Sequence, residues 1–564
     1  MTSTRPWITW LAGLALALRM GIALRPLDFV DRWFVPDDTF YTLGFARALA
    51  HNHGPTLDGV TLSNGFQPLL TFLLVPVFWL THDNDAALRA ALLIGALADA
   101  ATVLFLGKLA QSLAGRQAGI LSAALWALSP VAIANALCGL ETSLALALQL
   151  ATMQSYVRLR DPPTQPARQA VRWAVFGACA GFAILARIST VSLIAALVVA
   201  ELLHVLRQRK PEPARGPLLA VGSACLVLLP WWSYCLLRFG TPIPESGGAV
   251  IQITRLHRAL YLTTQKQLAW AAGSVLGAPF SDLPWLREAL FDHSSLGVLG
   301  FAGVACVLFG VAFRLLLLER EAPHSQRAVG AFALHALCVL SLYAFFVPAL
   351  WFFRRYLVSS QALFTLLFGI ALARAWARLK SASPQGGLRG AALGAWLTAG
   401  LFTALGLARI WQFATESPGS SPDFGLHGAK GYREAARGVL ARVPSGAVLG
   451  AFQSGALSYY APAGVRVVNL DGVVDHEARS AAQELRLSDY AASRALTHLT
   501  DWQFNLDAFE RLSSQAYTRP TMRPIETQVE RQGPDRFSLL ALSWPRAASR
   551  PTLEPAARGR DNAH

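Results

Sequence analysis

Charged residues are scarce in this sequence. Only 15% of its 564 residues are charged, whereas 54% are hydrophobic. An ordinary soluble protein carries about 25% charged residues. This balance excludes a disordered, fibrous or nucleic-acid-binding chain, although the formal net charge is +15. It predicts a protein that lies mostly within a membrane, in contact with its lipids.

Lysine and cysteine are also rare. Five lysines leave arginine to supply nearly all of the 49 basic side chains, a bias typical of GC-rich bacterial genomes. Because the basic residues of membrane proteins gather in cytoplasmic loops, we interpret the excess as a signal of orientation. The six cysteines are scattered through apolar segments without CxxC spacing, which argues against a disulfide framework or a zinc site.

Long apolar runs dominate the rest of the sequence. A membrane-spanning helix needs about 20 mostly apolar residues, and the sequence contains about eleven such segments. They cover residues 7–25, 86–107, 118–136, 138–157, 171–187, 189–206, 217–237, 295–313, 329–348, 356–373 and 390–409. We therefore expect a polytopic α-helical membrane protein, with a membrane module over residues 1–412.

Basic residues mark every second loop between these segments, and the positive-inside rule places those loops in the cytoplasm. By alternation the N-terminus is cytoplasmic. The loops 26–85 and 238–294, and the chain beyond the last apolar segment, then lie outside. Gly65–Leu80 is apolar but short and holds Pro68 and Pro76, so we expect a re-entrant or juxtamembrane helix there. This orientation fits a multi-pass protein of a bacterial inner membrane.

The last part of the chain differs in composition. Turn signals separate short apolar runs, which predicts a small extracytoplasmic α/β domain over residues 413–550. The expected strands are Ala447–Phe452 and Val465–Leu470, and the expected helices are Tyr432–Arg442 and Ala478–Leu485. Residues 551–564 have the composition of a disordered tail.

The first outer loop carries the most informative residues. Two adjacent carboxylates, Asp37 and Asp38, follow the first apolar segment, and Thr39–Ala50 has helical spacing of its apolar residues. Pro36 and the two acids favour a helix start, because acidic side chains complement the positive end of a helix. The simpler interpretation is that the pair only caps this helix.

A carboxylate held near the lipid headgroups suits one reaction in particular. If the substrate is a sugar on a lipid phosphate, the acceptor hydroxyl loses a proton as it attacks, and a carboxylate can take that proton. The leaving phosphate needs basic donors. Basic candidates on the same face are Arg187, Arg238, Arg255, Arg258, Lys266, Arg354 and Arg355. The alternative for each of these residues is that its side chain extends to the lipid headgroups.

Several other polar residues have two interpretations each. Glu141 lies at an outer turn, where it either faces the cavity or caps the next helix. His51 and His53 are metal ligands or part of a solvated loop, and the lack of a third ligand at metal spacing favours the loop. Asp471 and Asp475 follow an expected strand and have the composition of ordinary turns.

Two charged residues fall inside expected membrane segments. Arg19 lies in the first segment and Asp99 in the second. Unpaired burial in a membrane is costly, so both are expected to face protein or a polar cavity. A direct Arg19–Asp99 pair is the simplest hypothesis.

The motif around the acidic pair resembles that of a known family. Pro36-Asp37-Asp38-Thr39-x-Tyr41 is similar to the acidic motif after the first helix of the GT-C superfamily of membrane glycosyltransferases. The protein-mannosyltransferase-like branch, with the aminoarabinose transferases, and the terminal arabinofuranosyltransferases are the most similar groups. The first loop resembles that of the latter group through a string that contains His53, Asn64 and Gln67.

Short patches elsewhere add to this resemblance. They are Ala186-Arg187, Pro230-Trp-Trp232, Phe239-Gly240-Thr-Pro242, Arg354-Arg-Tyr356, Phe452-Gln-Ser-Gly455 and Asn469-Leu-Asp-Gly472. The patch at Arg187 continues with Ile188 and Ser189 and lacks the acid that the family carries there.

The resemblance implies an inverting glycosyltransferase with a polyprenyl-phosphate sugar as donor and an extracytoplasmic glycan, lipid or protein as acceptor. Asp37 is then the general base and Asp38 the supporting acid. The substrate-binding residues would be Arg187, Arg354, Arg355, Tyr41, Glu141, Arg238, His53, Asn64 and Gln67. A lipid-phosphate leaving group requires no metal, so none is expected to be obligatory, with a divalent ion at Asp37 and Asp38 as the alternative.

Three other functions compete with this one. A transporter or flippase explains the many helices, but the sequence shows no repeated halves. A polymerase or ligase that uses a diphosphate-linked donor shares the topology but is expected to have larger loops. A non-catalytic scaffold for envelope assembly would tolerate the loss of Asp37 and Asp38.

Overall fold

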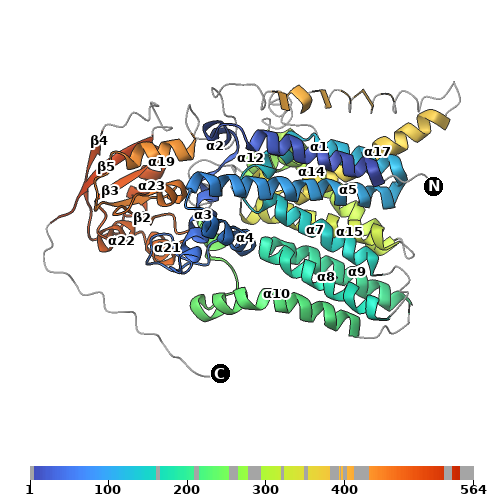
Figure 1. The fold of residues 1–564 in the computed structure, drawn as a ribbon, viewed down its shortest axis with the longest axis horizontal. Helices are drawn as coiled ribbons and strands as arrows, with labels where there is room; N and C mark the ends of the chain where they lie inside the picture. The colour runs from blue at the N-terminus through green and yellow to red at the C-terminus, as the bar shows by residue number, and fades with distance from the viewer. Residues whose placement is uncertain are drawn as a thin grey trace.

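The computed structural model describes a helical bundle with a small α/β domain at one end (Figure 1). It describes residues 5–159, 166–208, 215–252, 264–276, 294–318, 323–347, 353–381, 431–525 and 537–545, with scattered residues between 393 and 411. The expected span 390–409 and the expected tail 551–564 lie mostly or wholly outside these residues.

The bundle consists of long apolar helices. Their bounds are α1 Arg5–Ala23, α5 Asn84–Ala127, α7 Thr142–Arg158, α8 Pro166–Ala186, α9 Val191–Gln208, α10 Arg215–Phe239, α12 Thr264–Leu276, α14 Ser294–Phe313, α15 His324–Ser341 and α17 Val358–Ser381. Short elements join them: α6 Pro130–Ala136, η1 Ile188–Thr190, η2 Arg314–Leu318, η3 Leu342–Phe346 and α16 Phe353–Tyr356. Within the described ranges, 7 helices are long and apolar enough to cross a membrane, which confirms a polytopic helical membrane protein.

The helix α5 contains two of the expected spans. Its backbone leaves helical geometry at Ala114 and Gly115, where Gly115 has φ of 82°. The chain reverses there, as the hydrogen bond from Trp126 Nε1 to Asp99 Oδ1 at 2.9 Å shows. A straight helix would hold two residues 27 positions apart far from each other. The expected spans 86–107 and 118–136 thus form an antiparallel pair, and the second continues as α6.

The structure confirms the Arg19–Asp99 pair inside the bundle. Both residues are fully buried. Arg19 Nε donates to Asp99 Oδ2 at 2.7 Å, and Arg19 Nη1 donates to the carbonyl of Ala127 at 2.7 Å. The pair therefore joins α1 to both arms of α5 and fixes the start of the bundle.

Breaking this pair is expected to be costly. Asp99→Asn or Arg19→Gln alone leaves the other group buried and uncompensated, so each lowers the free energy of unfolding by about 3–5 kcal/mol. The double variant is expected to lose less than the sum of the two. Thermal unfolding of the four proteins in detergent measures this coupling, and strict additivity would show that the pair contributes nothing.

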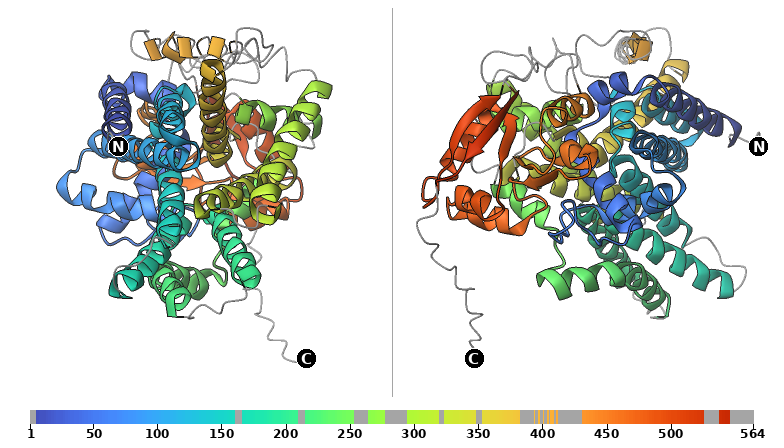
Figure 2. Two further views of the ribbon diagram at one scale, coloured as in Figure 1. Left: turned by 90° about the vertical axis from the view of Figure 1, so that its right-hand side faces the viewer. Right: turned by 60° about the vertical axis from the view of Figure 1, so that its left-hand side comes forward.

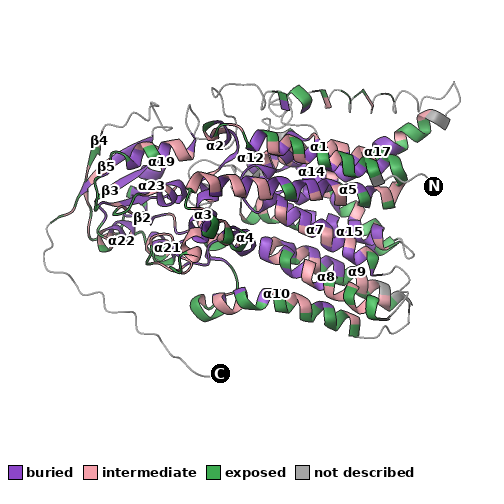
Figure 3. Ribbon diagram, in the orientation of Figure 1, coloured by how far each residue is buried: buried purple, intermediate pink, exposed green. Residues whose placement is uncertain are grey.

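The bundle surface carries exposed apolar side chains, as expected for helices that face lipid. Trp10 on α1 is 74% exposed, and Leu226 and Leu237 on α10 are 75% and 85% exposed. Figure 3 shows exposed positions along α10 and α17, whereas the helices between them are more buried.

The small domain contains a five-stranded sheet with the order β2-β1-β3-β5-β4. The strands are β1 Val448–Ala451, β2 Arg466–Asn469, β3 His498–Trp502, β4 Thr521–Ile525 and β5 Phe537–Ser543. β1 is parallel to β2 and β3, with Gly450 opposite Val468 and Leu499, and β5 is antiparallel to β3 and β4. The helices are α19 Tyr432–Leu440, α20 Gly455–Tyr460, α21 His476–Gln483, α22 Leu487–Ser493 and α23 Gln503–Arg511. The expected strands and helices are confirmed to within a few residues.

Three helices of the first loop lie between the bundle and this domain (Figures 1 and 2). They are α2 Leu27–Phe34, α3 Asp37–Ala50 and α4 Pro68–Leu80. Phe40 and Leu74 share one buried hydrophobic cluster with Leu88 of α5 and with Val439 and Tyr459 of the domain. The domain is therefore packed onto the bundle through a continuous core, with the first loop at its centre.

Candidate functional site

Asp37 does not cap its own helix, although it lies in the first turn of α3. Its Oδ2 accepts the backbone N–H of Gly455 at 2.8 Å, and its Oδ1 accepts that of Ala456 at 2.8 Å. Those N–H groups open α20 of the C-terminal domain, where a helix end leaves donors unsatisfied. The sequence interpretation of a local cap was therefore wrong, because the cap lies on a helix 418 positions away.

Burial shapes the chemistry of this carboxyl group. Asp37 is only 6% exposed. Burial raises the pKa of Asp37 to about 7. The N–H groups of Ala456 and Gly455 lower this pKa, whereas the charges of Asp38 and Asp501 raise it further. A carboxylate with this proton affinity suits a general base at neutral pH.

Asp31 makes a second contact of the same kind. It is fully buried, and its Oδ2 accepts the backbone N–H groups of Arg433 at 2.9 Å and Glu434 at 3.4 Å, at the start of α19. Burial raises the pKa of Asp31 to about 7. Two aspartates of the first loop thus each cap a helix of the C-terminal domain.

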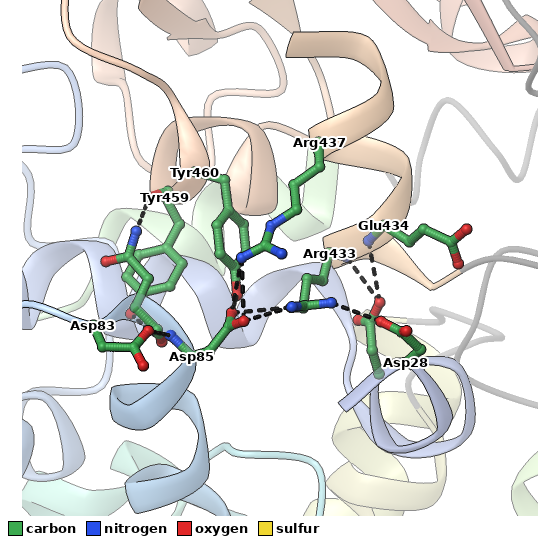
Figure 4. A network of polar contacts seen from close by, with 10 residues as sticks. Asp28, Asp83, Asp85, Arg433, Glu434, Arg437, Tyr459 and Tyr460 are labelled. Atoms are coloured by element: carbon green, nitrogen blue, oxygen red, sulfur yellow. Dashed lines mark hydrogen bonds and ion pairs between the residues drawn. The ribbon is translucent and has the colours of Figure 1, made fainter. Parts of the chain in front are cut away.

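Ion pairs surround the second cap (Figure 4). Arg433 Nε donates to Asp85 Oδ1 at 3.0 Å, and its Nη1 donates to Asp28 Oδ1 at 2.7 Å. Asp85 also accepts from Arg437 and from the hydroxyl of Tyr460. This network fixes the domain on α2 and on the start of α5.

Tyr41 joins α3 to two strand ends of the domain. Its hydroxyl oxygen accepts hydrogen bonds from the N–H of Ser454 at 3.1 Å and from Nδ2 of Asn469 at 3.2 Å. The hydroxyl group donates a hydrogen bond to the carbonyl of Phe452 at 3.2 Å. Burial raises the pKa of Tyr41 well above its usual range, so it stays a neutral hydroxyl. It holds the loop after β1 beside Asp37.

Asp38 belongs to a separate group of charges next to Asp37. Arg355 Nη2 donates to Asp38 Oδ2, and the carbonyl of Arg355 accepts from Arg187 Nη1 at 3.1 Å. Arg187 Nη1 also lies 3.9 Å from Glu141 Oε1. Because Glu141 precedes α7, Arg187 follows α8 and Arg355 precedes α17, three ends of bundle helices meet beside α3.

One nitrogen in this group has no hydrogen-bond partner among the residues that the structure describes. Arg187 Nη2 is buried and unsatisfied, although the Arg187 guanidinium lies 4.8 Å from the ring of Tyr356. Tyr356 stacks on Tyr343 with 4.4 Å between ring centres. A buried guanidinium nitrogen without an acceptor is costly. An anion bound here would supply the missing acceptor.

The other expected site residues lie elsewhere. Arg238 is exposed at the end of α10, and His53 is exposed in the loop after α3. Asn64 is fully buried and its Oδ1 accepts the N–H of Glu245 at 3.0 Å, which holds the loop after α10. Gln67 occupies the position before α4, and the Arg354 side chain lies outside the described residues.

The domain also supplies acidic residues that the sequence analysis did not assign to the site. Asp471 follows β2, and its charge interacts with those of Asp38 and Asp37. Asp501 is the residue before the last of β3, and its Oδ2 accepts the N–H groups of Phe452 and Gln453 at 2.8 and 2.9 Å. The motif patches at 452–455 and 469–472 were the available signal, but only the fold brings them to Asp37.

Protein groups hold both carboxylates of the acidic pair. Both oxygens of Asp37 accept backbone N–H groups, and Asp38 is held by Arg355. Among the residues that the structure describes, no group of three His, Cys, Asp or Glu side chains has the spacing of a metal site. A hard cation takes several oxygen ligands, more than these two carboxylates supply by themselves.

Gly455 is required for the Asp37 contact. A Cβ at this position would lie 2.3 Å from the carbonyl oxygen of Asp37 and 2.9 Å from its Oδ2. Gly455→Ala is therefore expected to displace Asp37 and to lower the free energy of unfolding by about 1–3 kcal/mol.

Thermal unfolding in detergent checks this expectation, with Gly438→Ala as the matched control. A Cβ at Gly438 meets nothing closer than 3.9 Å, and alanine favours its helix by up to about 1 kcal/mol. Equal stability of the two variants would contradict the described contact.

No protein-family profile matches the chain, and no curated protein matches it in sequence. Solved structures do match it. ArnT from Cupriavidus metallidurans in the apo state is 13% identical with a TM-score of 0.51, over 95% of this chain and 98% of that chain. The same protein bound to undecaprenyl phosphate is 14% identical with a TM-score of 0.50, over 96% and 98%.

An archaeal enzyme gives a similar match. The oligosaccharyltransferase of Archaeoglobus fulgidus in the apo form is 12% identical with a TM-score of 0.53, over 92% of this chain and 73% of that chain. At these identities the similarity concerns the arrangement of the chain. The protein therefore shares its fold with ArnT and with this oligosaccharyltransferase.

Proposed function

We propose that this protein is an inverting glycosyltransferase that moves a sugar from a polyprenyl phosphate to a hydroxyl of an extracytoplasmic acceptor. The observation that carries the proposal is the charged group of buried Arg187, Arg355 and Glu141 with partly exposed Asp38, beside Asp37. The Arg187 guanidinium, with its unsatisfied nitrogen, is linked through Arg355 to Asp38, the neighbour of the carboxyl group whose pKa burial raises to about 7. One suits a phosphate and the other suits a hydroxyl proton.

The reaction is a single displacement. The acceptor oxygen bonds to the anomeric carbon while the bond from that carbon to the phosphate oxygen breaks, and the electron pair leaves with the phosphate. The acceptor proton passes to Asp37. Attack from the face opposite the phosphate inverts the anomeric centre. Arg187 and Arg355 stabilise the charge that develops on the leaving phosphate.

The comparisons support this assignment only through the fold. The matched ArnT structure contains undecaprenyl phosphate, which makes a polyprenyl-phosphate donor the natural choice for this chain. The positive-inside rule places the site on the extracytoplasmic side of a bacterial inner membrane. A diphosphate-linked donor is the second candidate, because a polymerase or ligase that uses one would share the helical topology.

The test uses the full chain in lipid nanodiscs. A panel of undecaprenyl-phosphate sugars and their diphosphate counterparts is offered with hydroxyl acceptors, and the released lipid is followed by mass spectrometry. We expect release of undecaprenyl phosphate from one monophosphate donor. Release only from a diphosphate donor would replace the proposed donor class, and release from neither would refute the proposal.

The rate of transfer is expected to depend on pH through Asp37. As a base it must be deprotonated, and its pKa is raised to about 7. The rate therefore falls as the pH drops below 7, about tenfold per unit once most of the carboxyl is protonated. Asp38, Asp471, Asp501, Tyr41 and Tyr432 are the titratable groups around it. A pH–rate profile between 5 and 9 that stays flat on the acid side would contradict this role.

A further inference from the structure

A chain of polar side chains lies inside the helical bundle, beside the break between α8 and α9. Gln149 of α7, His335 of α15 and Ser359 of α17 are all buried. Thr190 of η1 is fully buried as well, and Ser192 of α9 is half-buried. The helix α15 packs against α7, α9 and α17 (Figure 1), so these residues meet between four helices. Polar groups at such depth in a membrane protein are costly and usually serve a function.

Hydrogen bonds join the five side chains. Gln149 Nε2 donates to Thr190 Oγ1 at 3.0 Å, and Gln149 Oε1 accepts from the hydroxyl of Ser359 at 2.8 Å. His335 Nδ1 lies 2.6 Å from Ser192 Oγ, and His335 Nε2 lies 3.3 Å from Ser359 Oγ. The two ends of this polar chain, Thr190 and Ser192, therefore both lie at the break between α8 and α9.

The hydrogens of the polar chain fit a neutral imidazole. Ser192 Oγ lies 2.8 Å from the carbonyl oxygen of Ser189, which can only accept, so the Ser192 hydroxyl donates there. His335 Nδ1 then carries the hydrogen that Ser192 Oγ accepts, and His335 Nε2 is left as an acceptor. The hydroxyl of Ser359 lies between this nitrogen and Gln149 Oε1. His335 therefore needs no positive charge to complete the chain.

The break that the polar chain holds is the part of the backbone that carries Arg187. Arg187 has φ of −157° and ψ of 119°, so the backbone leaves helical geometry at this residue before it enters η1. The backbone N–H of Thr190 donates to the carbonyl of Arg187 at 3.0 Å. Thr190 thus contacts Arg187 through its backbone and Gln149 through its side chain. The direction in which Arg187 leaves the bundle depends on this turn.

We propose that Thr190 and Gln149 are positioning residues for the donor phosphate, because they fix the turn that presents Arg187. This inference rests on the proposed function, in which Arg187 binds that phosphate. Hydrogen bonds between a guanidinium and a phosphate depend on the placement of the donors, so a small displacement of the turn weakens them. Neither Thr190 nor Gln149 has to touch the lipid, since each acts through Arg187.

Thr190→Val in the full chain tests the proposal, because valine has nearly the same shape and lacks the oxygen that accepts from Gln149. The probe is undecaprenyl phosphate, titrated against the protein in nanodiscs. We expect its dissociation constant to rise about 3- to 10-fold, the effect of one lost hydrogen bond. In the Arg187→Gln protein the same change should add less than about twofold, because the residue that Thr190 positions is already gone.

The matched control is Thr152→Val. Thr152 is also fully buried, but its hydroxyl donates to the carbonyl of Leu148 within its own helix, α7. The control should bind undecaprenyl phosphate like the wild type. Gln149→Leu removes the other side of the Thr190 contact, so it should show the same pattern as Thr190→Val, including the loss of its effect beside Arg187→Gln. Thermal unfolding in detergent shows which variants fold.

Four results would overturn the inference. Thr190→Val and Thr152→Val could bind the lipid equally well, or the weakening by Thr190→Val could persist in full beside Arg187→Gln, as expected of a purely structural contact. Failure of both Thr190→Val and Gln149→Leu to fold, with a folded control, would likewise assign the polar chain to stability alone. No weakening by Arg187→Gln itself would remove the phosphate role of Arg187 as well. Absence of undecaprenyl phosphate binding by the wild type would instead refute the proposed function, and the inference with it.

Discussion

Asparagine in place of Asp37 is expected to slow sugar transfer by about 10²–10⁴-fold, the usual contribution of a general base. The amide has almost the same shape and keeps one oxygen for the N–H of Gly455 or Ala456, but it cannot take the acceptor proton. The residual rate should also lose its fall below pH 7, because that fall belongs to the carboxyl group of Asp37. The rate is measured with the full chain in nanodiscs, with saturating donor and acceptor.

The control for this variant is Asp83→Asn. Asp83 is exposed and caps α5 by accepting the N–H of Asp85, and asparagine caps a helix equally well. Wild-type rates in the control and a large loss at Asp37, with similar unfolding temperatures, would support the assignment. A rate within about threefold of the wild type for Asp37→Asn would show that another group takes the proton.

Replacement of Arg187 with glutamine is expected to weaken the binding of undecaprenyl phosphate. The variant loses the charged donor whose Nη2 is unsatisfied within the described part of the chain. A charged hydrogen bond contributes about 1.5–3 kcal/mol, so the dissociation constant should rise roughly 10- to 100-fold. Native mass spectrometry or a fluorescence titration in nanodiscs measures this constant.

Arg238→Gln is the matched control, because Arg238 is exposed at the end of α10 and outside the buried group. It should bind undecaprenyl phosphate like the wild type. Equal weakening by both changes would point to general attraction between a basic surface and the phosphate, and no weakening at Arg187 would remove it from the phosphate site.

The sequence predicted the local features of the site well. A carboxylate pair after the first apolar segment, followed by a helical pattern, located α3 correctly at Asp37–Ala50. The cost of a buried charge led directly to the Arg19–Asp99 pair. Turn residues around short apolar runs placed β1 and β2. In each of these cases the information lies within a few neighbouring residues or in a rule that applies to any membrane segment.

The remaining features depend on contacts between distant parts of the chain. Nothing near Asp37 indicates that its carboxylate caps α20, because the partner groups are backbone N–H groups that every residue carries. Arg355, Arg187 and Arg238 have similar surroundings in sequence, yet the fold buries the first two and exposes the third. Asp471 followed an ordinary turn pattern, and only the docking of the domain brings it to the acidic pair.

The central claim is that the sugar leaves the lipid at this site. The most direct measurement is mass spectrometry of all lipid and glycan species after the wild-type protein, in sealed proteoliposomes, meets an undecaprenyl-phosphate sugar and an acceptor. The account predicts free undecaprenyl phosphate and glycosylated acceptor in equal amounts, with both lost in Asp37→Asn. An intact donor that only changes leaflet, with no glycosylated acceptor, would contradict the account and identify a transporter.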